Sequence, residues 1–506
     1  MCIIKPGMRW KKRRCRSRPS IGFYMSDFLF VLASLRPLRR IRAWSIDPKR
    51  RVARVSPMVA GVFLMFVLGI GGLNAAQDDP DRIVAELLVL VVGDGERRQQ
   101  AITFIETEWQ RDFTPMLLEV LYLSRDPAVA VKLIQLLEAK TGQQHRFDIN
   151  KWYQWLWAQK PQVHPQYAHF KSALYGLIDP KFEGYFSGDR TMKIRLDEVR
   201  WGGVRQDGIP PLRNPKMISA GKAEYLDDAN IIFGLEVNGD ARAYPKRILA
   251  WHEMFVDDVG GVPVAGVYCT LCGTMILYKT VHKGVDHKLG TSGFLYRSNK
   301  LMYDQETQSL WNTIWGRPVI GPLADKDITL ERMSVVTTTW GEWRRRHPNS
   351  KVLSLDTGHQ RDYGEGVAYQ EYFATDELMF QVPKLDTRLK NKDEVLGLIF
   401  AQHPEKPLAI AASYLTKNTV HHDRVGDLRF VVLTDKSGAN RVYEAKDVTF
   451  KTWDFDRTVM DKKGVSWNLD EAQLKASDGR VLYRLPAHRA FWFGWYSAYT
   501  HTRLVQ

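Results

Sequence analysis

The sequence predicts an α+β protein in which N-terminal helical hairpins precede one large β-rich domain. Two observations lead to this prediction. Between residues 81 and 177, apolar side chains recur at the spacing of amphipathic helices. Beyond about residue 200, this period gives way to alternating apolar and polar positions, interrupted by Gly, Pro and Asn-Gly turns.

Residues 1–77 predict a basic leader followed by an export signal or a membrane anchor. Residues 1–57 hold sixteen Lys and Arg against two Asp, which accounts for nearly all of the formal net charge of +15. Residues 56–77 carry no charge and end in the small residues Asn74-Ala75-Ala76. Since positive flanks stay in the cytoplasm, we expect the chain after Gln77 to lie outside it, in the periplasm or on the outer face of the membrane.

The same distribution of charge bears on the partners of the protein. A nucleic-acid binder needs basic residues on its folded surface, where they displace counterions from phosphate. Here the basic residues are concentrated in the leader, so we expect no nucleic-acid partner. We expect contact with the membrane only through an N-terminal segment that remains uncleaved.

Residues 78–180 predict a helical module of HEAT-like hairpins. Asp126 is placed as an N-cap, with Pro127 at the first helical position, and Gly142 ends that helix. Helical hairpins that stack side by side commonly present extended binding faces. The sequence therefore predicts a protein partner for this module.

Residues 200–506 predict the β-rich domain. Residues 231–237 and 241–244 flank Asn238-Gly239, which is the preferred two-residue hairpin turn. Two further strands are expected at 264–268 and 275–278, and a short helix at 340–346.

Cysteine usage directs attention to one point of this domain. Of the four cysteines, Cys2 and Cys15 lie in the leader, and Cys269 and Cys272 lie in the part expected to be exported. A spacing of two residues lets one tight turn aim both sulfurs at the same point, which suits a shared metal ion or an exchangeable disulfide. A structural disulfide between them would stabilise the fold only weakly, because closing so short a loop removes little entropy from the unfolded chain.

Three functions follow from this pair and its neighbours. The first is binding of copper or zinc by Cys269 and Cys272, with His252 or Met275 as further ligands; a thioether favours copper, and imidazole suits either metal. His282 and His287, just beyond the pair, are further zinc ligands to consider. The second is thiol–disulfide oxidoreductase activity, and the third is a non-enzymatic protein-binding scaffold with an inert cysteine pair.

Several motifs in this region occur in an order typical of one family. They are Asn238-Gly239-Asp240-Ala241-Arg242-Ala243-Tyr244-Pro245, His252-Glu253, Gly260-Gly261-Val262-Pro263-Val264, Tyr268-Cys269-Thr270-Leu271-Cys272-Gly273-Thr274, Gly290-Thr291-Ser292-Gly293-Phe294-Leu295-Tyr296, and Leu301-Met302-Tyr303-Asp304 with Ser309-Leu310-Trp311. In these motifs residues 200–500 resemble the bacterial domain-of-unknown-function 3179 family. The resemblance implies a bacterial, extracytoplasmic protein and brings no catalytic residue or cofactor with it.

Overall fold

The computed structural model describes residues 80–506, so the predicted leader and export signal lie outside the described residues. Residues 80–506 belong to one compact unit. Within residues 80–506, no helix combines the length and the apolar character that crossing a bilayer requires.

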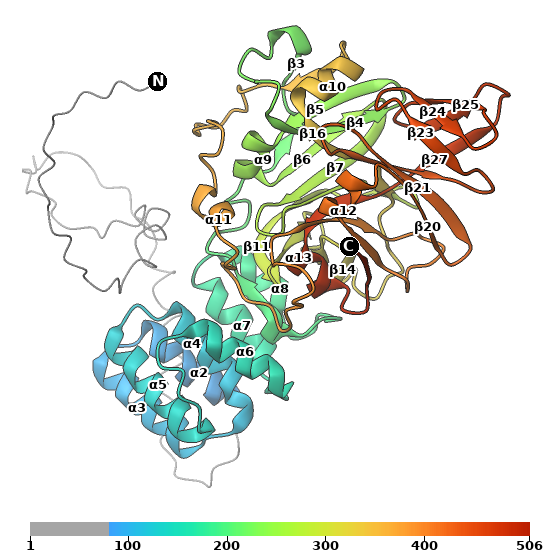
Figure 1. Cartoon of the computed structure of the whole chain (residues 1–506). Helices are drawn as coiled ribbons and strands as arrows, with labels where there is room; N and C mark the ends of the chain where they lie inside the picture. The colour runs from blue at the N-terminus through green and yellow to red at the C-terminus, as the bar shows by residue number, and fades with distance from the viewer. Residues whose placement is uncertain (1–79) are drawn as a thin grey trace, which may run out of the picture. The chain divides into compact units, whose positions relative to one another are not determined.

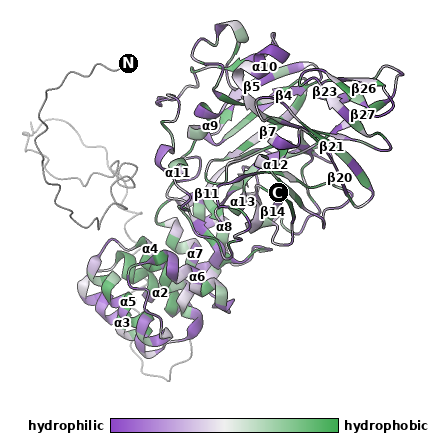
Figure 2. Ribbon diagram, in the orientation of Figure 1, coloured by the Kyte–Doolittle hydropathy of each residue, from purple (hydrophilic) through white to green (hydrophobic). Residues whose placement is uncertain are grey.

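The helical module has the predicted character of stacked hairpins. Helix α2 packs on α3 and α4 packs on α5, and the two pairs contact each other through α2 with α4 and α3 with α5. Figure 1 shows these helices gathered together, and Figure 2 shows hydrophilic and hydrophobic residues on the same helices, as amphipathic packing requires. The helices are α2 (Pro80–Val92), α3 (Gly95–Thr107), α4 (Thr114–Leu123), α5 (Pro127–Thr141), α6 (Ile149–Gln159), α7 (Tyr167–Gly176) and α8 (Glu183–Phe186).

The predicted ends of α5 are confirmed. The carboxylate of Asp126 accepts a hydrogen bond of 2.9 Å from the N–H of Ala128, and Pro127 occupies the first helical position. Gly142 follows the helix with a φ of +73°, a left-handed conformation that glycine adopts without steric penalty. The local sequence therefore sets both ends of this helix.

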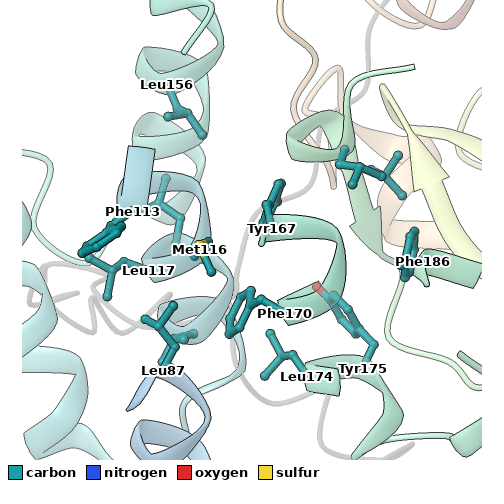
Figure 3. Close-up of a cluster of buried hydrophobic side chains, with 14 of the residues drawn as sticks. Leu87, Phe113, Met116, Leu117, Leu156, Tyr167, Phe170, Leu174, Tyr175 and Phe186 are labelled. Atoms are coloured by element: carbon teal, nitrogen blue, oxygen red, sulfur yellow. The ribbon is translucent and has the colours of Figure 1, made fainter. Parts of the chain in front are cut away.

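The helical module and the β-rich domain share one hydrophobic core. Phe294 of strand β11 (Leu289–Tyr296) lies with its ring centroid 5.0 Å from that of Tyr175, 4.8 Å from that of Phe182 and 5.0 Å from that of Phe186. The same core continues through α2, α4 and α6, and Figure 3 shows part of it around Phe170. The module is therefore packed into the domain that follows it.

The β-rich domain contains several sheets, and with the helical module it confirms the α+β prediction. One sheet has the order β1 (Val199–Trp201), β11, β12 (Asn299–Asp304), β13 (Leu310–Asn312), β14 (Arg317–Ile320). A second has the order β15 (Arg332–Met333), β8 (Thr274–Lys279), β7 (Val262–Cys269), β6 (Met254–Val259), β2 (Leu212–Arg213). A third has the order β16 (Val336–Thr339), β4 (Ile231–Val237), β5 (Asp240–Pro245), β17 (Lys351–Leu353), β3 (Met217–Ser219).

The C-terminal third of the chain adds two further sheets. A four-stranded sheet has the order β28 (His488–Phe491), β18 (Glu394–Leu398), β19 (Leu408–Ala411), β29 (Arg503–Val505). An eight-stranded sheet has the order β20 (Val420–Val425), β21 (Leu428–Thr434), β22 (Asn440–Glu444), β27 (Val481–Leu485), β26 (Gln473–Ala476), β25 (Ser466–Leu469), β24 (Thr458–Asp461), β23 (Phe450–Trp453). A short ribbon pairs β9 (Val281–His282) with β10 (Val285–Asp286).

The expected hairpin at Asn238-Gly239 is confirmed. β4 and β5 pair antiparallel up to Val237 and Asp240, and the two turn residues have φ values of +50° and +82°. Positive φ at both positions is what this tight turn demands. The helix expected at 340–346 is present as α10 (Trp340–Arg346), and the other short helices are α9 (Lys246–His252), α11 (Gln370–Ala374), α12 (Ala412–Lys417) and α13 (Trp492–Ala498).

Candidate thiol site

Cys269 and Cys272 lie at the turn between β7 and β8. β7 ends at Cys269, and β8 begins at Thr274, its partner across the ladder. The N–H of Cys272 donates a hydrogen bond of 3.2 Å to the carbonyl of Cys269. Gly273 then returns the chain into β8 with a φ of +57°. Both thiols are free, so the turn holds two sulfurs that are available to each other.

The pair is sealed from solvent. Cys269 is 2% exposed and Cys272 is fully buried. Two glycines permit the close packing around them, because a Cβ on Gly273 would lie 2.9 Å from the ring of Phe491, and a Cβ on Gly494 would lie 2.9 Å from the Cβ of Cys272. The apolar neighbours are Leu271, Leu295, Tyr372, Leu378, Phe380, Val382, Phe491 and Phe493.

The two thiols differ in acidity. Burial alone raises the pKa of the Cys269 thiol, but hydrogen bonds from the Cys272 thiol and from the backbone N–H groups of Lys300 and Cys272 lower this pKa below its usual value. Burial and the nearby Cys269 sulfur raise the pKa of Cys272 well above its usual value. Cys269 is therefore the first of the pair to become a thiolate.

The proton of Cys272 has two acceptors within reach. The Cys272 thiol lies 3.3 Å from the carbonyl oxygen of Ser298, to which it donates in the structure. The sulfur of Cys269 is the alternative acceptor, and it becomes the stronger one when it carries a negative charge. The S–H group of Cys272 can therefore redirect its hydrogen bond from Ser298 to Cys269 as that sulfur ionises, while Cys272 keeps its proton.

A buried ion pair lies beside the turn. The ammonium group of Lys300, on β12, donates a hydrogen bond of 2.8 Å to the carbonyl of Glu253 and lies 3.5 Å from the Glu253 carboxylate. The hydroxyl of Thr270, between the two cysteines, donates to the same carboxylate at 3.3 Å. Glu253 follows α9 with a φ of +54°, an uncommon conformation for a residue with a side chain. The thiol pair therefore has one cation and one anion built in next to it.

Residues 369–382, here called the cover segment, pack against the cysteines. They include α11, which is labelled in Figure 1. The hydroxyl of Tyr372 donates a hydrogen bond of 2.8 Å to the carbonyl of Leu271. Farther along the segment, the amide of Gln154 in the helical module donates to the side-chain oxygen of Gln381 at 3.0 Å. The cover segment therefore touches both the thiol turn and the helical module.

His252 has hydrogen-bond partners other than the two sulfurs. Its Nδ1–H donates to the carbonyl of Pro210 at 2.9 Å, and its Nε2 accepts a hydrogen bond of 2.6 Å from the hydroxyl of Tyr363. Burial lowers the pKa of His252 to about 4, so the imidazole is neutral at physiological pH. Beyond Tyr363 lies an open cavity of about 780 Å³, lined by the 359–364 loop with Tyr225, Arg247 and Leu355.

The remaining candidate ligands also lie elsewhere. Met275 is paired with Tyr268, one ladder position beyond Cys269, and successive side chains of a strand point to opposite faces. It belongs to the core around Phe255, a different cluster from that of the cysteines. The Nδ1 of His287 lies 3.4 Å from the Asp304 carboxylate. His282 is in β9.

Of the four residues expected to bind metal, the structure thus brings together Cys269 and Cys272 and directs His252 and Met275 to other surroundings. Residues 80–506 contain no group of three or more His, Cys, Asp or Glu side chains arranged to hold a metal ion. The structure identifies none of the four as a metal ligand, and metal binding stays a prediction.

Lys300 is the member of the site that sequence reasoning missed. Every residue of β12 is buried, and the strand reads Asn-Lys-Leu-Met-Tyr-Asp, with Lys300 in its second position. No local pattern relates Lys300 to Glu253, which is 47 residues earlier in the chain. A lysine that directly precedes the apolar run Leu301-Met302-Tyr303 is the one signal that could have pointed to it.

Comparison with known proteins gives a family and adds no activity. The sequence profile of a protein family of unknown function, DUF3179, matches residues 206–502, which is more than half of the chain. No curated protein and no solved structure matches the chain. The matched region contains the whole thiol site, from Glu253 to Phe493, and the chain belongs to the DUF3179 family.

Proposed function

We propose that the protein is a thiol–disulfide exchange protein that acts through Cys269 and Cys272. The observation that carries this proposal is the pair of free thiols at one tight turn, where hydrogen bonds from the Cys272 thiol and from backbone N–H groups lower the pKa of Cys269. An attacking thiolate and a protonated second thiol are the two species that exchange requires. A compartment outside the cytoplasm, proposed on the leader and export signal, would supply disulfides as substrates.

The reaction proceeds in two displacements. The Cys269 thiolate attacks one sulfur of a substrate disulfide, so that a mixed disulfide forms and the other substrate sulfur leaves as a thiolate and takes up a proton. Cys272 then loses its proton and attacks the sulfur of Cys269, which forms the Cys269–Cys272 disulfide and releases the second substrate thiol. The substrate gains two electrons and two protons, and the cysteine pair loses them.

Substrate must reach a pair that is closed in this structure. The cover segment packs against the cysteines. Tyr372 and Gln381 bond it to the thiol turn and the helical module, and Asn391 and Lys392 bond to Tyr372, Thr375 and Asp376 within it. It follows β17 in a stretch with α11 as its one helix before β18, and a loop of this length is commonly functional. We infer that the cover segment moves aside during exchange.

Metal binding is the competing proposal, and the two cysteines are the candidate ligands that support it best. Two thiolates suit Cu(I), which is a soft ion, and the carboxylate of Glu253 lies beside them. Exchange is preferred because the remaining predicted ligands, His252 and Met275, have other partners.

The test combines redox titration with trapping of the mixed disulfide. Full-length protein is equilibrated in glutathione buffers, alkylated, and the peptide that contains both cysteines is analysed by mass spectrometry. A potential between about −270 and −120 mV supports exchange, whereas a value below about −300 mV marks a structural disulfide and refutes it. Cys272→Ser should accumulate a mixed disulfide on Cys269, and Cys269→Ser should accumulate much less on Cys272.

Metal content is measured on the same preparations. Stoichiometric copper or zinc that is lost in Cys269→Ser and Cys272→Ser would favour the metal proposal, and it would count against exchange if the cysteines could then not be oxidised. The protein partner expected for the helical module stays a prediction on which neither proposal depends.

A further inference from the structure

The β-rich domain contains one arrangement of sheets twice. The strands β16-β4-β5-β17 and β28-β18-β19-β29 have the same order, with two antiparallel pairs followed by one parallel pair. The antiparallel ladders β15-β8-β7-β6 and β27-β22-β21-β20 also correspond. The chain visits the equivalent elements in the same order, with α9 and α12 after β5 and β19 and with α10 and α13 after β16 and β28. Residues 230–353 and 393–505 are therefore built alike.

Equivalent side chains make equivalent contacts in the two halves. A Cβ on Gly234 of β4 would lie 2.4 Å from the ring of Trp343, and a Cβ on Gly397 of β18 would lie 2.2 Å from the ring of Trp495. Each of these tryptophans is fully buried and donates its indole N–H at 2.9 Å to a hydroxyl seven residues farther along the chain. The two halves therefore agree in packing and hydrogen bonding as well as in strand order.

Hydrogen bonds identify the counterpart of the thiol turn. The N–H of Tyr268 donates to the carbonyl of Glu253 at 2.8 Å, and the N–H of Thr434 donates to the carbonyl of Thr419 at 2.9 Å. Tyr268 lies at the end of β7, and Thr434 lies at the end of β21. The turn between β21 and β22 therefore occupies, in the second half, the place of the thiol turn.

This second turn carries no thiol. Asp435 stands where Cys269 stands in the first, and Ser437 stands where Cys272 does, directly before a glycine of positive φ. The Asp435 carboxylate accepts hydrogen bonds from the N–H and the hydroxyl of Ser437, and it forms a buried ion pair with Arg441 at 2.8 Å. A charge network thus holds the second turn in place of a cysteine pair.

Each half reaches the turn of the other. The N–H of Phe491, at the end of β28, donates to the carbonyl of Cys272 at 2.7 Å, and a Cβ on Gly494 of α13 would lie 2.9 Å from that of Cys272. In the opposite direction, the hydroxyl of Thr338 on β16 lies 3.1 Å from the hydroxyl of Ser437. β28 and α13 of the second half therefore form one wall of the thiol site in the first.

Helix α13 also holds the acceptor of the Cys272 thiol. This acceptor is the carbonyl of Ser298, in the turn between β11 and β12, at 3.3 Å. The next residue, Asn299, donates through its side-chain amide to the carbonyl of Gly494 at 3.3 Å and to the hydroxyl of Ser497 at 3.1 Å. Ser298 has a φ of +63°, a conformation that a residue with a side chain keeps only where its surroundings hold it.

We propose that residues 230–353 and 393–505 are two copies of one module, and that the second copy completes the thiol site of the first. Asn299 and Ser497 are positioning residues, which hold the Ser298 carbonyl where the thiol of the second cysteine donates to it. A disulfide has no S–H group, so this hydrogen bond stabilises only the reduced pair and raises its reduction potential. The inference rests on the proposed exchange function, because it assigns the second copy a part in that site.

Asn299→Ala should therefore lower the reduction potential of the pair. Full-length protein is equilibrated with reduced and oxidised glutathione, which exchange two electrons and two protons with the cysteines, and the peptide that contains both is quantified by mass spectrometry after alkylation. The equilibrium constant for reduction should fall about three- to tenfold, which corresponds to about 15–30 mV. Ser497→Ala removes one of the two contacts and should give a smaller shift of the same sign, which can be measured even if Asn299→Ala does not fold.

The duplication supplies matched controls. Thr338→Val removes the hydroxyl contact with the second turn and should leave the potential unchanged. Trp343→Phe and Trp495→Phe each remove one of two equivalent indole hydrogen bonds, so urea denaturation should show similar losses of stability. Only Trp495→Phe, which loosens α13, should also lower the potential.

No shift in Asn299→Ala and Ser497→Ala, or equal shifts in the two tryptophan variants, would overturn the part assigned to the second copy. A loss of stability confined to one tryptophan variant would overturn the equivalence of the copies. The exchange function can fail separately. A very low potential in the wild type would remove it, while differences in potential between the variants would still report the hydrogen bond to Ser298.

Discussion

The hydroxyl of Tyr372 donates to the carbonyl of Leu271 at 2.8 Å, so one hydrogen bond joins the cover segment to the turn that carries both cysteines. Leu271 lies between the two cysteines, and Tyr372 is buried against them. The closed state of the site therefore depends in part on a contact that a single substitution can remove.

Tyr372→Phe should make Cys269 more accessible. A neutral hydrogen bond contributes about 0.5–1.5 kcal/mol, so the open state should be populated roughly 2–10 times more often. The measurement is the alkylation rate of Cys269 at fixed pH. Tyr363→Phe, which loses its hydroxyl bond to His252 outside the cover segment, should leave this rate unchanged. Equal rates in Tyr372→Phe and the wild type would show that this bond does not hold the segment closed.

Gly273→Ala should destabilise the protein more than Gly261→Ala. Both glycines have positive φ, which adds about 1 kcal/mol of strain for alanine. Only at residue 273 does the new Cβ also meet the ring of Phe491, and overpacking of this kind adds about 1–3 kcal/mol. Urea denaturation of the two variants isolates the second effect by difference. Equal losses of stability would mean that the Phe491 ring moves aside freely.

Acidification should destabilise the fold through His252. Its pKa in the folded state, about 4, lies below the value of about 6.5 expected in the unfolded chain. The unfolded chain therefore binds more protons between these pH values, and stability falls as the pH drops from about 6.5 towards 4. We expect His252 to account for a loss on the order of 1 kcal/mol between pH 7 and 5.

Urea denaturation at the two pH values checks this expectation. His252→Gln should show a smaller difference between pH 7 and 5 than the wild type, because glutamine does not titrate. His488, whose pKa burial lowers to about 3, contributes in the same direction and remains in both proteins. An unchanged difference in the variant would assign the acid sensitivity to other groups.

Glu119→Gln should be strongly destabilising. Its carboxylate accepts hydrogen bonds from Tyr167, Tyr175 and Lys171, and all of these side chains are buried. Neutralising Glu119 leaves the charge of Lys171 without its counterion, which typically raises the free energy of the fold by about 3–5 kcal/mol. Thermal or urea denaturation measures the effect.

Glu86→Gln is the comparison for that experiment. Glu86 pairs with Arg97 at 3.4 Å, and the arginine is about half exposed. Exposed pairs contribute about 0–1 kcal/mol, so this variant should be nearly as stable as the wild type. A small effect at Glu119 would mean that Lys171 is neutral in the folded protein.

Local sequence was sufficient to predict the features that depend only on neighbouring residues. The cap at Asp126, the stop at Gly142 and the hairpin at Asn238-Gly239 each depend on the chemistry of a few adjacent positions, and each was predicted. The α+β class followed from the change of period near residue 200, since period reflects which side chains share a face.

Only part of the thiol site could be predicted from local sequence. The spacing of Cys269 and Cys272 is local and was read directly, but Lys300 and the cover segment reach the site through long-range folding. His252 and Met275 are close to the cysteines in sequence, and this proximity made them candidate ligands. The end of α9 turns His252 towards Tyr363, and strand alternation turns Met275 to the other face, so distance along the chain was a poor guide.

The core shared by the helical module and the β-rich domain affects how the region matched by the family profile can be produced by itself. The family match begins at residue 206, after β1, which is the edge strand beside β11, and after the aromatic residues of α7 and α8 that enclose Phe294. A protein truncated at that boundary would expose an unpaired sheet edge and a large apolar ring to water, both of which promote aggregation. Recombinant expression should therefore start upstream of α2, so that the helices that cover this edge and this ring are present.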